Sequence, residues 1–333
     1  MIRKYQFFLY IVTKFLGVLV KIMVSKHRVG LIFGKFYPLH CGHIYLIEKA
    51  ISQVDELHIL LGCEAIRDKQ LFDKSRLPKQ PQVSDRFAWL KETFKDRHNI
   101  HIHILDETGI EYYPNGWQDW SDRVKKILSE HKITPTVVFT SETQDVKNHQ
   151  LYFGCPVVTV DADREFMHIS ATEIRQNPYK NWPFIAQVAK PFFVKKVAII
   201  SHQKLNDLPV QFANIYNTEY VANGYINYIQ REVSTCHNQR YLSESDYIKI
   251  AMLQVERIST AERVANKLLF TSIDFATLAQ YYHQIFHKEH EVLKALTESY
   301  HFDLVINEKD LNPTHSSLEH FETVAKMVDA LLI

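Results

Sequence analysis

Short apolar runs alternate with stretches of helical apolar spacing over roughly the first 190 residues. Continuous apolar runs predict buried strands, whereas apolar residues three and four apart predict one face of a helix. The predicted strands are Val29–Phe33, Glu56–Gly62, Ile100–Leu105, Thr136–Thr140 and Pro156–Val160. The predicted helices are Ile44–Ile51, Ser84–Lys95 with Ser84 as N-cap, and Trp117–Glu130. This alternation predicts an α/β fold with a doubly wound parallel sheet that binds ligands at its strand ends.

A second domain is predicted after a linker from Asn181 to Phe193. It begins with the apolar run Lys196–Ile200, and a length of 333 residues suits two domains of ordinary size. We therefore expect one domain over residues 27–187 and a second over residues 194–333, preceded by an N-terminal extension, residues 1–26.

The extension is apolar, but Lys14 and Lys21 interrupt it. No run approaches the roughly 18 apolar residues of a membrane span. Three interpretations stay open: an amphipathic helix at a membrane surface, an extra helix packed on the domain, and upstream sequence outside the working protein. We favour the last two, and so do not expect membrane association.

Composition narrows the classes of partner. The chain is 46% hydrophobic and 23% charged with a net charge of +1, which argues against bulk attraction to nucleic acid. Its four cysteines show no CxxC spacing, so we expect a reducing, cytoplasmic location. The sequence leaves the oligomeric state open, a homo-oligomer included.

The first predicted strand runs into the sequence Gly-Lys-Phe-Tyr-Pro-Leu-His-Cys-Gly-His, residues 34–43, and then into a helix. The start of such a helix offers free N–H groups and the positive end of its dipole, which suit phosphate. His40 and His43, three residues apart, project from the same side. A His-x-x-His pair without a third ligand is incomplete as a zinc site, so we predict no metal bound directly by the protein.

Residues 34–43 resemble the GxFxPxHxGH signature of the nucleotidyltransferase superfamily. The resemblance implies that Gly34, Phe36, His40 and His43 bind ATP. A Rossmann-like sheet is the fold of that superfamily, in agreement with the pattern of strands and helices.

Residues 169–175, Ile-Ser-Ala-Thr-Glu-Ile-Arg, predict a second helix start with Ser170 or Thr172 as its cap. Arg175 follows one turn into this helix. By themselves these residues describe only a capped helix with a surface arginine. They resemble the ISxTxxR signature of the same superfamily, which implies that Ser170, Thr172 and Arg175 bind the ATP phosphates.

Two further stretches follow predicted strands. Asn115-Gly116 predicts a turn that places Trp117 at a helix start, where its indole could stack on a flat ring. Arg67 follows the second strand, where a cation could meet a phosphate. The alternatives are a packing tryptophan and a solvated charged loop.

Together with residues 67–72, 114–117, 140–142 and 166–178, these motifs resemble the NadR-type nicotinamide-nucleotide adenylyltransferase and ribosylnicotinamide kinase family over residues 27–310. The resemblance implies synthesis of NAD from ATP and nicotinamide mononucleotide, with Mg²⁺ accompanying the ATP. It implies catalytic roles for His40, His43, Lys35 and Arg175, and binding of the nicotinamide nucleotide by Trp117, Asn115 and Arg67.

The second domain departs from the family. The resemblance implies a P-loop kinase fold, but residues 201–209, Ser-His-Gln-Lys-Leu-Asn-Asp-Leu-Pro, contain no glycine and no GK[ST] ending. Ser272 stands where the kinase's first aspartate is expected, although Asp274 remains. We therefore expect a kinase-like fold without kinase activity.

Two other functions remain as alternatives. The first is a nucleotidyltransferase of the same fold acting on phosphopantetheine or a similar acceptor. The second is a non-enzymatic sensor of nicotinamide nucleotides.

Overall fold

The computed structural model describes residues 27–201, 207–228, 242–312, 314 and 316–333. The predictions for residues 1–26, for Cys236 and for most of the loop at 201–209 fall outside these residues. No helix within the described ranges is long and apolar enough to cross a membrane.

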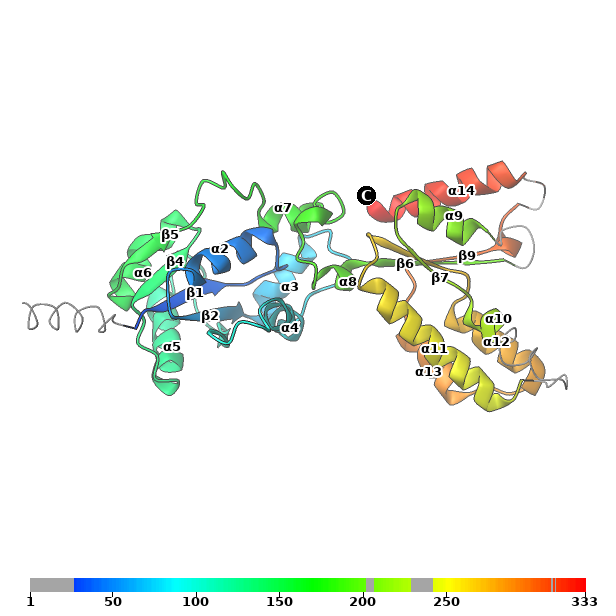
Figure 1. Ribbon diagram of the computed structural model, residues 1–333, viewed down its shortest axis with the longest axis horizontal. Coiled ribbons are helices and arrows are strands. Elements are labelled where there is room, and N and C mark those ends of the chain that lie inside the picture. The colour runs from blue at the N-terminus through cyan, green and yellow to red at the C-terminus, as the bar shows by residue number, and fades with distance from the viewer. Residues whose placement is uncertain (1–26, 202–206, 229–241, 313, 315) are drawn as a thin grey trace, which may run out of the picture. The chain divides into compact units, whose positions relative to one another are not determined.

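The described chain separates into two compact units, each with a parallel sheet (Figure 1). Along the sequence, the predicted boundary between residues 187 and 194 lies after β5, the last strand of the first sheet, and before β6, the first strand of the second. Residues 38–40, 69–82 and 169–187 nevertheless group with the second unit, although they precede that boundary.

The first sheet has the strand order β3-β2-β1-β4-β5. Its strands are β1 (Val29–Gly34), β2 (Glu56–Cys63), β3 (Ile100–Asp106), β4 (Val137–Thr140) and β5 (Val157–Thr159). All pairings are parallel. The order reverses direction between β1 and β4, so the doubly wound sheet predicted from the sequence is confirmed, with its switch point between those two strands.

Helices occupy both sides of this sheet, with α2 and α5 on opposite sides (Figure 1). The helices are α2 (Cys41–Ile51), α3 (Ala65–Asp73), α4 (Val83–Thr93), α5 (Trp117–Glu130) and α6 (Val146–Phe153), with the 3-10 turn η1 (Thr143–Asp145) ahead of α6. A core of Leu31, Leu60, Leu105 and Val138 packs against Val124 and Leu128 of α5. Helix α4 begins one residue before Ser84, so the N-cap predicted there is wrong.

The second unit carries a four-stranded parallel sheet in the order β7-β8-β6-β9. Its strands are β6 (Lys195–Ile200), β7 (Glu219–Val221), β8 (Leu268–Thr271) and β9 (Leu304–Asn307). Its helices are α7 (Ala171–Gln176), α8 (Lys190–Phe193), α9 (Leu208–Ile215), α10 (Gly224–Tyr228), α11 (Glu244–Glu262), α12 (Phe275–Phe286), α13 (Glu291–Ser299) and α14 (Ser317–Asp329). Its 3-10 turns are η2 (Trp182–Phe184), η4 (Glu308–Asp310) and η5 (Ala330–Leu332). Phe212 stacks on Phe270 and Phe321 in the core of this unit.

Candidate active site

A cavity of about 380 Å³ lies at the carboxyl ends of the strands in the first unit. Gly34 ends β1 and Thr140 ends β4, and both line the cavity. It therefore sits at the switch point of the sheet, where open α/β sheets bind ligands. Four predicted site residues besides Gly34 line it: Lys35, Arg67, Asn115 and Trp117.

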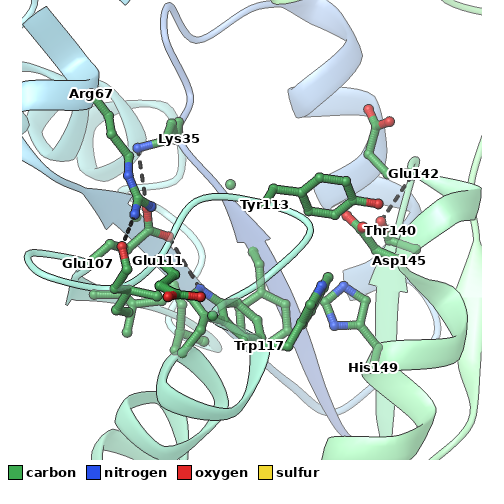
Figure 2. Close-up of a pocket in the computed structure, with 18 of the residues that line it drawn as sticks. Lys35, Arg67, Glu107, Glu111, Tyr113, Trp117, Thr140, Glu142, Asp145 and His149 are labelled. Atoms are coloured by element: carbon green, nitrogen blue, oxygen red, sulfur yellow. Dashed lines mark hydrogen bonds and ion pairs between the residues drawn. The ribbon is translucent and has the colours of Figure 1, made fainter. Parts of the chain in front are cut away.

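One wall carries two cations that are already paired with carboxylates (Figure 2). Lys35 Nζ lies 3.3 Å from Glu107 Oε2 and 3.2 Å from Asp68 Oδ1. Arg67 Nη1 lies 3.9 Å from the same Glu107 oxygen, and its Nε lies 3.7 Å from Glu64. The carboxylates hold both cations at the cavity, where each can meet an anionic ligand.

The opposite wall is aromatic. Trp117 lies edge-on to Trp120 at 5.3 Å and to His149 at 5.5 Å between ring centroids. Trp120 Nε1 donates a hydrogen bond of 3.2 Å to Glu107, which connects this wall to the cationic one. Half-buried Trp117 therefore lines the cavity with its ring supported from two sides, as a stacking platform requires.

The Asn-Gly turn before Trp117 depends on glycine. Gly116 has a φ of 73° and precedes the first residue of α5, and a Cβ there would lie 2.5 Å from the carbonyl oxygen of Glu111. A side chain would be strained by both the left-handed conformation and the contact. The turn thus fixes where the indole enters the cavity.

The loop after β1 packs tightly on itself. Phe36, at a φ of 49°, is fully buried, and its ring lies about 3.0 Å from where a Cβ on Gly34 would be. His43, on α2, meets the same ring edge-on at 4.9 Å. The missing side chain of Gly34, which the motif resemblance assigns to the ATP site, makes room for the ring of Phe36.

The remaining predicted residues do not line this cavity. His40 is buried in the second unit, where its backbone bridges to Ile185. Ser170 caps α7 of that unit in a capping box with Glu173, and Arg175 donates a 2.8 Å hydrogen bond to the hydroxyl of Thr172. Of the two candidate caps, Ser170 is confirmed. Six predicted ATP ligands are absent from the cavity lining: Phe36, His40, His43, Ser170, Thr172 and Arg175.

The lining residues that were not predicted from the sequence include three with ionisable side chains, Glu107, Asp145 and His149. Burial lowers the pKa of His149 to about 4, so the imidazole is neutral at neutral pH. Burial and the neighbouring Glu142 raise the pKa of Asp145. One signal was available in the sequence: all three lie within nine residues after a predicted strand.

Comparison with known proteins identifies the family. The chain is 42% identical over 283 residues to the trifunctional NAD biosynthesis/regulator protein NadR of Salmonella typhimurium, covering 84% of this chain and 68% of that protein. The Escherichia coli protein of the same name is 42% identical over 284 residues, covering 85% and 69%. The chain belongs to the NadR family. The family predicted from the sequence motifs is thereby confirmed.

Other comparisons agree with the family and the fold. The nicotinamide-nucleotide adenylyltransferase of Thermococcus onnurineus is 29% identical over 188 residues, 53% of this chain and 87% of that protein. A crystal structure of NadR protein in complex with NAD and AMP-PNP matches with a TM-score of 0.67 and 22% identity, covering 92% of this chain and 89% of the other. The α/β fold is thereby confirmed. No protein-family model matches the chain.

Proposed function

We propose that this NadR-family chain is a nicotinamide-nucleotide adenylyltransferase, which joins ATP and nicotinamide mononucleotide into NAD and releases pyrophosphate. The names of its relatives support this activity. The observation that carries it is the cavity at the switch point, with Trp117 on one wall and Lys35 and Arg67 on the other. A nicotinamide nucleotide has the matching parts, because it joins a flat ring to a phosphate.

The reaction needs positioning more than proton transfer. The phosphate of the mononucleotide attacks the α-phosphorus of ATP, the bond to the β-phosphate oxygen breaks, and pyrophosphate leaves with the electron pair. The nucleophile is already an anion, so no strong base is needed. Orientation of the two phosphates and stabilisation of the growing negative charge supply the rate.

The proposed roles follow the motifs. His43 and His40 hold the α- and β-phosphates, while Lys35 and Arg175 stabilise the leaving pyrophosphate. Gly34, Phe36, Ser170 and Thr172 complete the ATP site, and Trp117, Asn115 and Arg67 bind the nicotinamide nucleotide. Lys35 has the support of geometry, since it lines the cavity together with the nucleotide-binding residues.

Mg²⁺ would accompany ATP in this reaction and neutralise its phosphate charge. Within the described ranges, no group of three or more His, Cys, Asp or Glu side chains could hold a metal ion. The cation would therefore be bound mainly by phosphate oxygens and water, which is how Mg²⁺ commonly binds at nucleotide sites.

We further propose that the second unit lacks ribosylnicotinamide kinase activity. Asp274, the remaining acidic residue of the expected pair, accepts a 2.8 Å hydrogen bond from the backbone N–H of Thr277 and so caps α12. Ser272 stands where the first aspartate of that pair is expected, and its hydroxyl is hydrogen-bonded to the hydroxyl of Tyr220 at 2.9 Å. Both side chains are thus engaged in hydrogen bonds within the second unit, which supports a structural role for them.

Assays of product formation with three substrates distinguish the adenylyltransferase from the alternative acceptor, the sensor and an active kinase. The purified chain with ATP, Mg²⁺ and nicotinamide mononucleotide should form NAD and pyrophosphate over many turnovers. Replacing the mononucleotide by phosphopantetheine should give no product, and product there would favour the alternative acceptor. NAD formation at less than one turnover would favour a sensor. With ribosylnicotinamide and ATP, mononucleotide in excess over the protein would show that the kinase is active.

A further inference from the structure

One carboxylate, that of Glu107, contacts both walls of the cavity (Figure 2). Its Oε2 lies 3.3 Å from Lys35 Nζ and 3.9 Å from Arg67 Nη1 on the cationic wall. Its Oε1 accepts the 3.2 Å hydrogen bond from Trp120 Nε1 on the aromatic wall. The Glu107 side chain is only 13% exposed, so water competes little for these partners. A single side chain thus joins the two walls.

The surroundings of Glu107 fix where its carboxylate lies. Its backbone N–H donates a 2.8 Å hydrogen bond to the carbonyl of Cys63, the last residue of β2. The carboxylate packs against Gly62 of the same strand, where a Cβ would lie 2.7 Å from Glu107 Oε1. Because Gly62 belongs to a strand, any residue could adopt its extended backbone. What the missing side chain of Gly62 provides is room for the carboxylate.

The two cations have other partners for their charge. Lys35 Nζ also lies 3.2 Å from Asp68 Oδ1, and Arg67 Nε lies 3.7 Å from Glu64 Oε2. Glu107 is therefore not required to neutralise either cation. As an anion at the cavity, it also weakens the attraction between these cations and a ligand phosphate. A group that lowers affinity and is fastened to both walls has a geometric role.

We propose that Glu107 is a positioning residue, which sets the distance between the ring platform Trp117 and the cations that meet phosphate. This inference rests on the proposed function. Trp117 lies edge-on to Trp120 at 5.3 Å, so the hydrogen bond to Trp120 also restrains the platform. The nicotinamide nucleotide spans both walls, and its phosphate must approach the α-phosphorus of ATP in line. A misplacement of about 1 Å can lower the rate of such a step by about 10².

Glu107→Gln tests the charge, because the amide keeps an acceptor for Trp120 and loses the attraction to the cations. Rates of NAD formation give kcat, and calorimetry gives the Kd of nicotinamide mononucleotide and the number of binding sites. We expect kcat to fall about 10- to 100-fold. The Kd should fall about fivefold, because the phosphate meets the cations without a competing carboxylate. Slower turnover with tighter binding, at an unchanged number of sites, is not a result of partial unfolding.

Two other variants separate position from charge. Gly62→Ala keeps the charge and displaces the carboxylate, because the new Cβ occupies its place. Its kcat should fall as in Glu107→Gln, whereas its Kd should not fall. Trp120→Phe removes the donor at the other end of the same bridge. Combined with Glu107→Gln, it should lower kcat by clearly less than the product of the two single losses.

Glu130→Gln is the matched control, because Glu130 is exposed at the end of α5 and outside the cavity lining. It should change neither kcat nor Kd, and urea denaturation should show that each variant is folded. Unchanged kcat in Glu107→Gln would overturn the inference, as would weaker binding in that variant or fully multiplicative losses in the double variant. Absence of NAD formation by the unaltered chain would contradict the proposed function instead.

Discussion

Arg86 holds the cationic wall of the site from within the core, and replacing it should destabilise the first unit. The side chain is fully buried on α4. It donates hydrogen bonds to the backbone carbonyls of Lys35 at 2.8 Å and Gly62 at 3.1 Å, and it forms an ion pair with Asp68, which is only 6% exposed. The change we consider is Arg86→Met, which keeps most of the length of the side chain but removes the positive charge and the hydrogen-bond donors of the guanidinium.

The expected loss follows from what the change leaves behind. Breaking a buried ion pair by removing one partner costs about 3–5 kcal/mol. Two carbonyls that lose their donor add about 1 kcal/mol each. Lys35, 3.2 Å from Asp68, still compensates part of the carboxylate charge. If that compensation offsets about as much as the two carbonyls add, the free energy of unfolding should fall by about 3–5 kcal/mol, a large part of the roughly 5–15 kcal/mol of an ordinary domain. Activity should fall as well, because the backbone of Lys35 loses its anchor.

The assay is urea denaturation followed by tryptophan fluorescence, since three of the four tryptophans, Trp89, Trp117 and Trp120, belong to the first unit. Lys95→Met on the exposed Lys95–Glu92 pair is the control and should have no measurable effect. The double variant Arg86→Met with Asp68→Asn should lose clearly less than the sum of the two single losses. Additive losses, or an Arg86→Met curve that matches the control, would refute this account of the cationic wall.

Three further outcomes are expected. His43→Ala should lower kcat by about 10²–10³, the range for losing one group that stabilises charge in the transition state, and unchanged turnover would remove His43 from the mechanism. Gly116→Ala should raise KM for the nicotinamide nucleotide and destabilise the first unit by more than about 1 kcal/mol, measured by titration and urea denaturation, because its Cβ would collide with Glu111. Burial holds the pKa values of His58 and His103 at about 4 in the folded chain, below the ordinary 6.5. The unfolded state therefore takes up protons first, so the melting temperature should be highest above pH 6.5 and fall as the pH drops toward 4; a constant melting temperature over that window would contradict it.

The strands of the first sheet, several of its helices and the family of this protein could be predicted from the sequence, because they depend on local pattern. Helix α5 begins and ends at the predicted residues Trp117 and Glu130, and Ser170 caps α7 through the predicted local hydrogen bonds. The order of strands and helices then sets a parallel sheet, since strands separated by helices return in the same direction. The motif at residues 34–43 is likewise a pattern of residues close together in the sequence, and together with the other motifs it indicated the family.

Only the tertiary structure decided which distant side chains share the cavity. Asp145 and His149 follow one strand and Glu107 another, and no local pattern distinguishes them from the many other polar residues of the chain. The role of Arg86 could not be predicted either, because an arginine on a predicted helix is normally solvated. In the structure its hydrogen-bond partners come from the loop after β1, from strand β2 and from helix α3. Periodicity describes neighbours along the chain, while a binding site is made of neighbours in space.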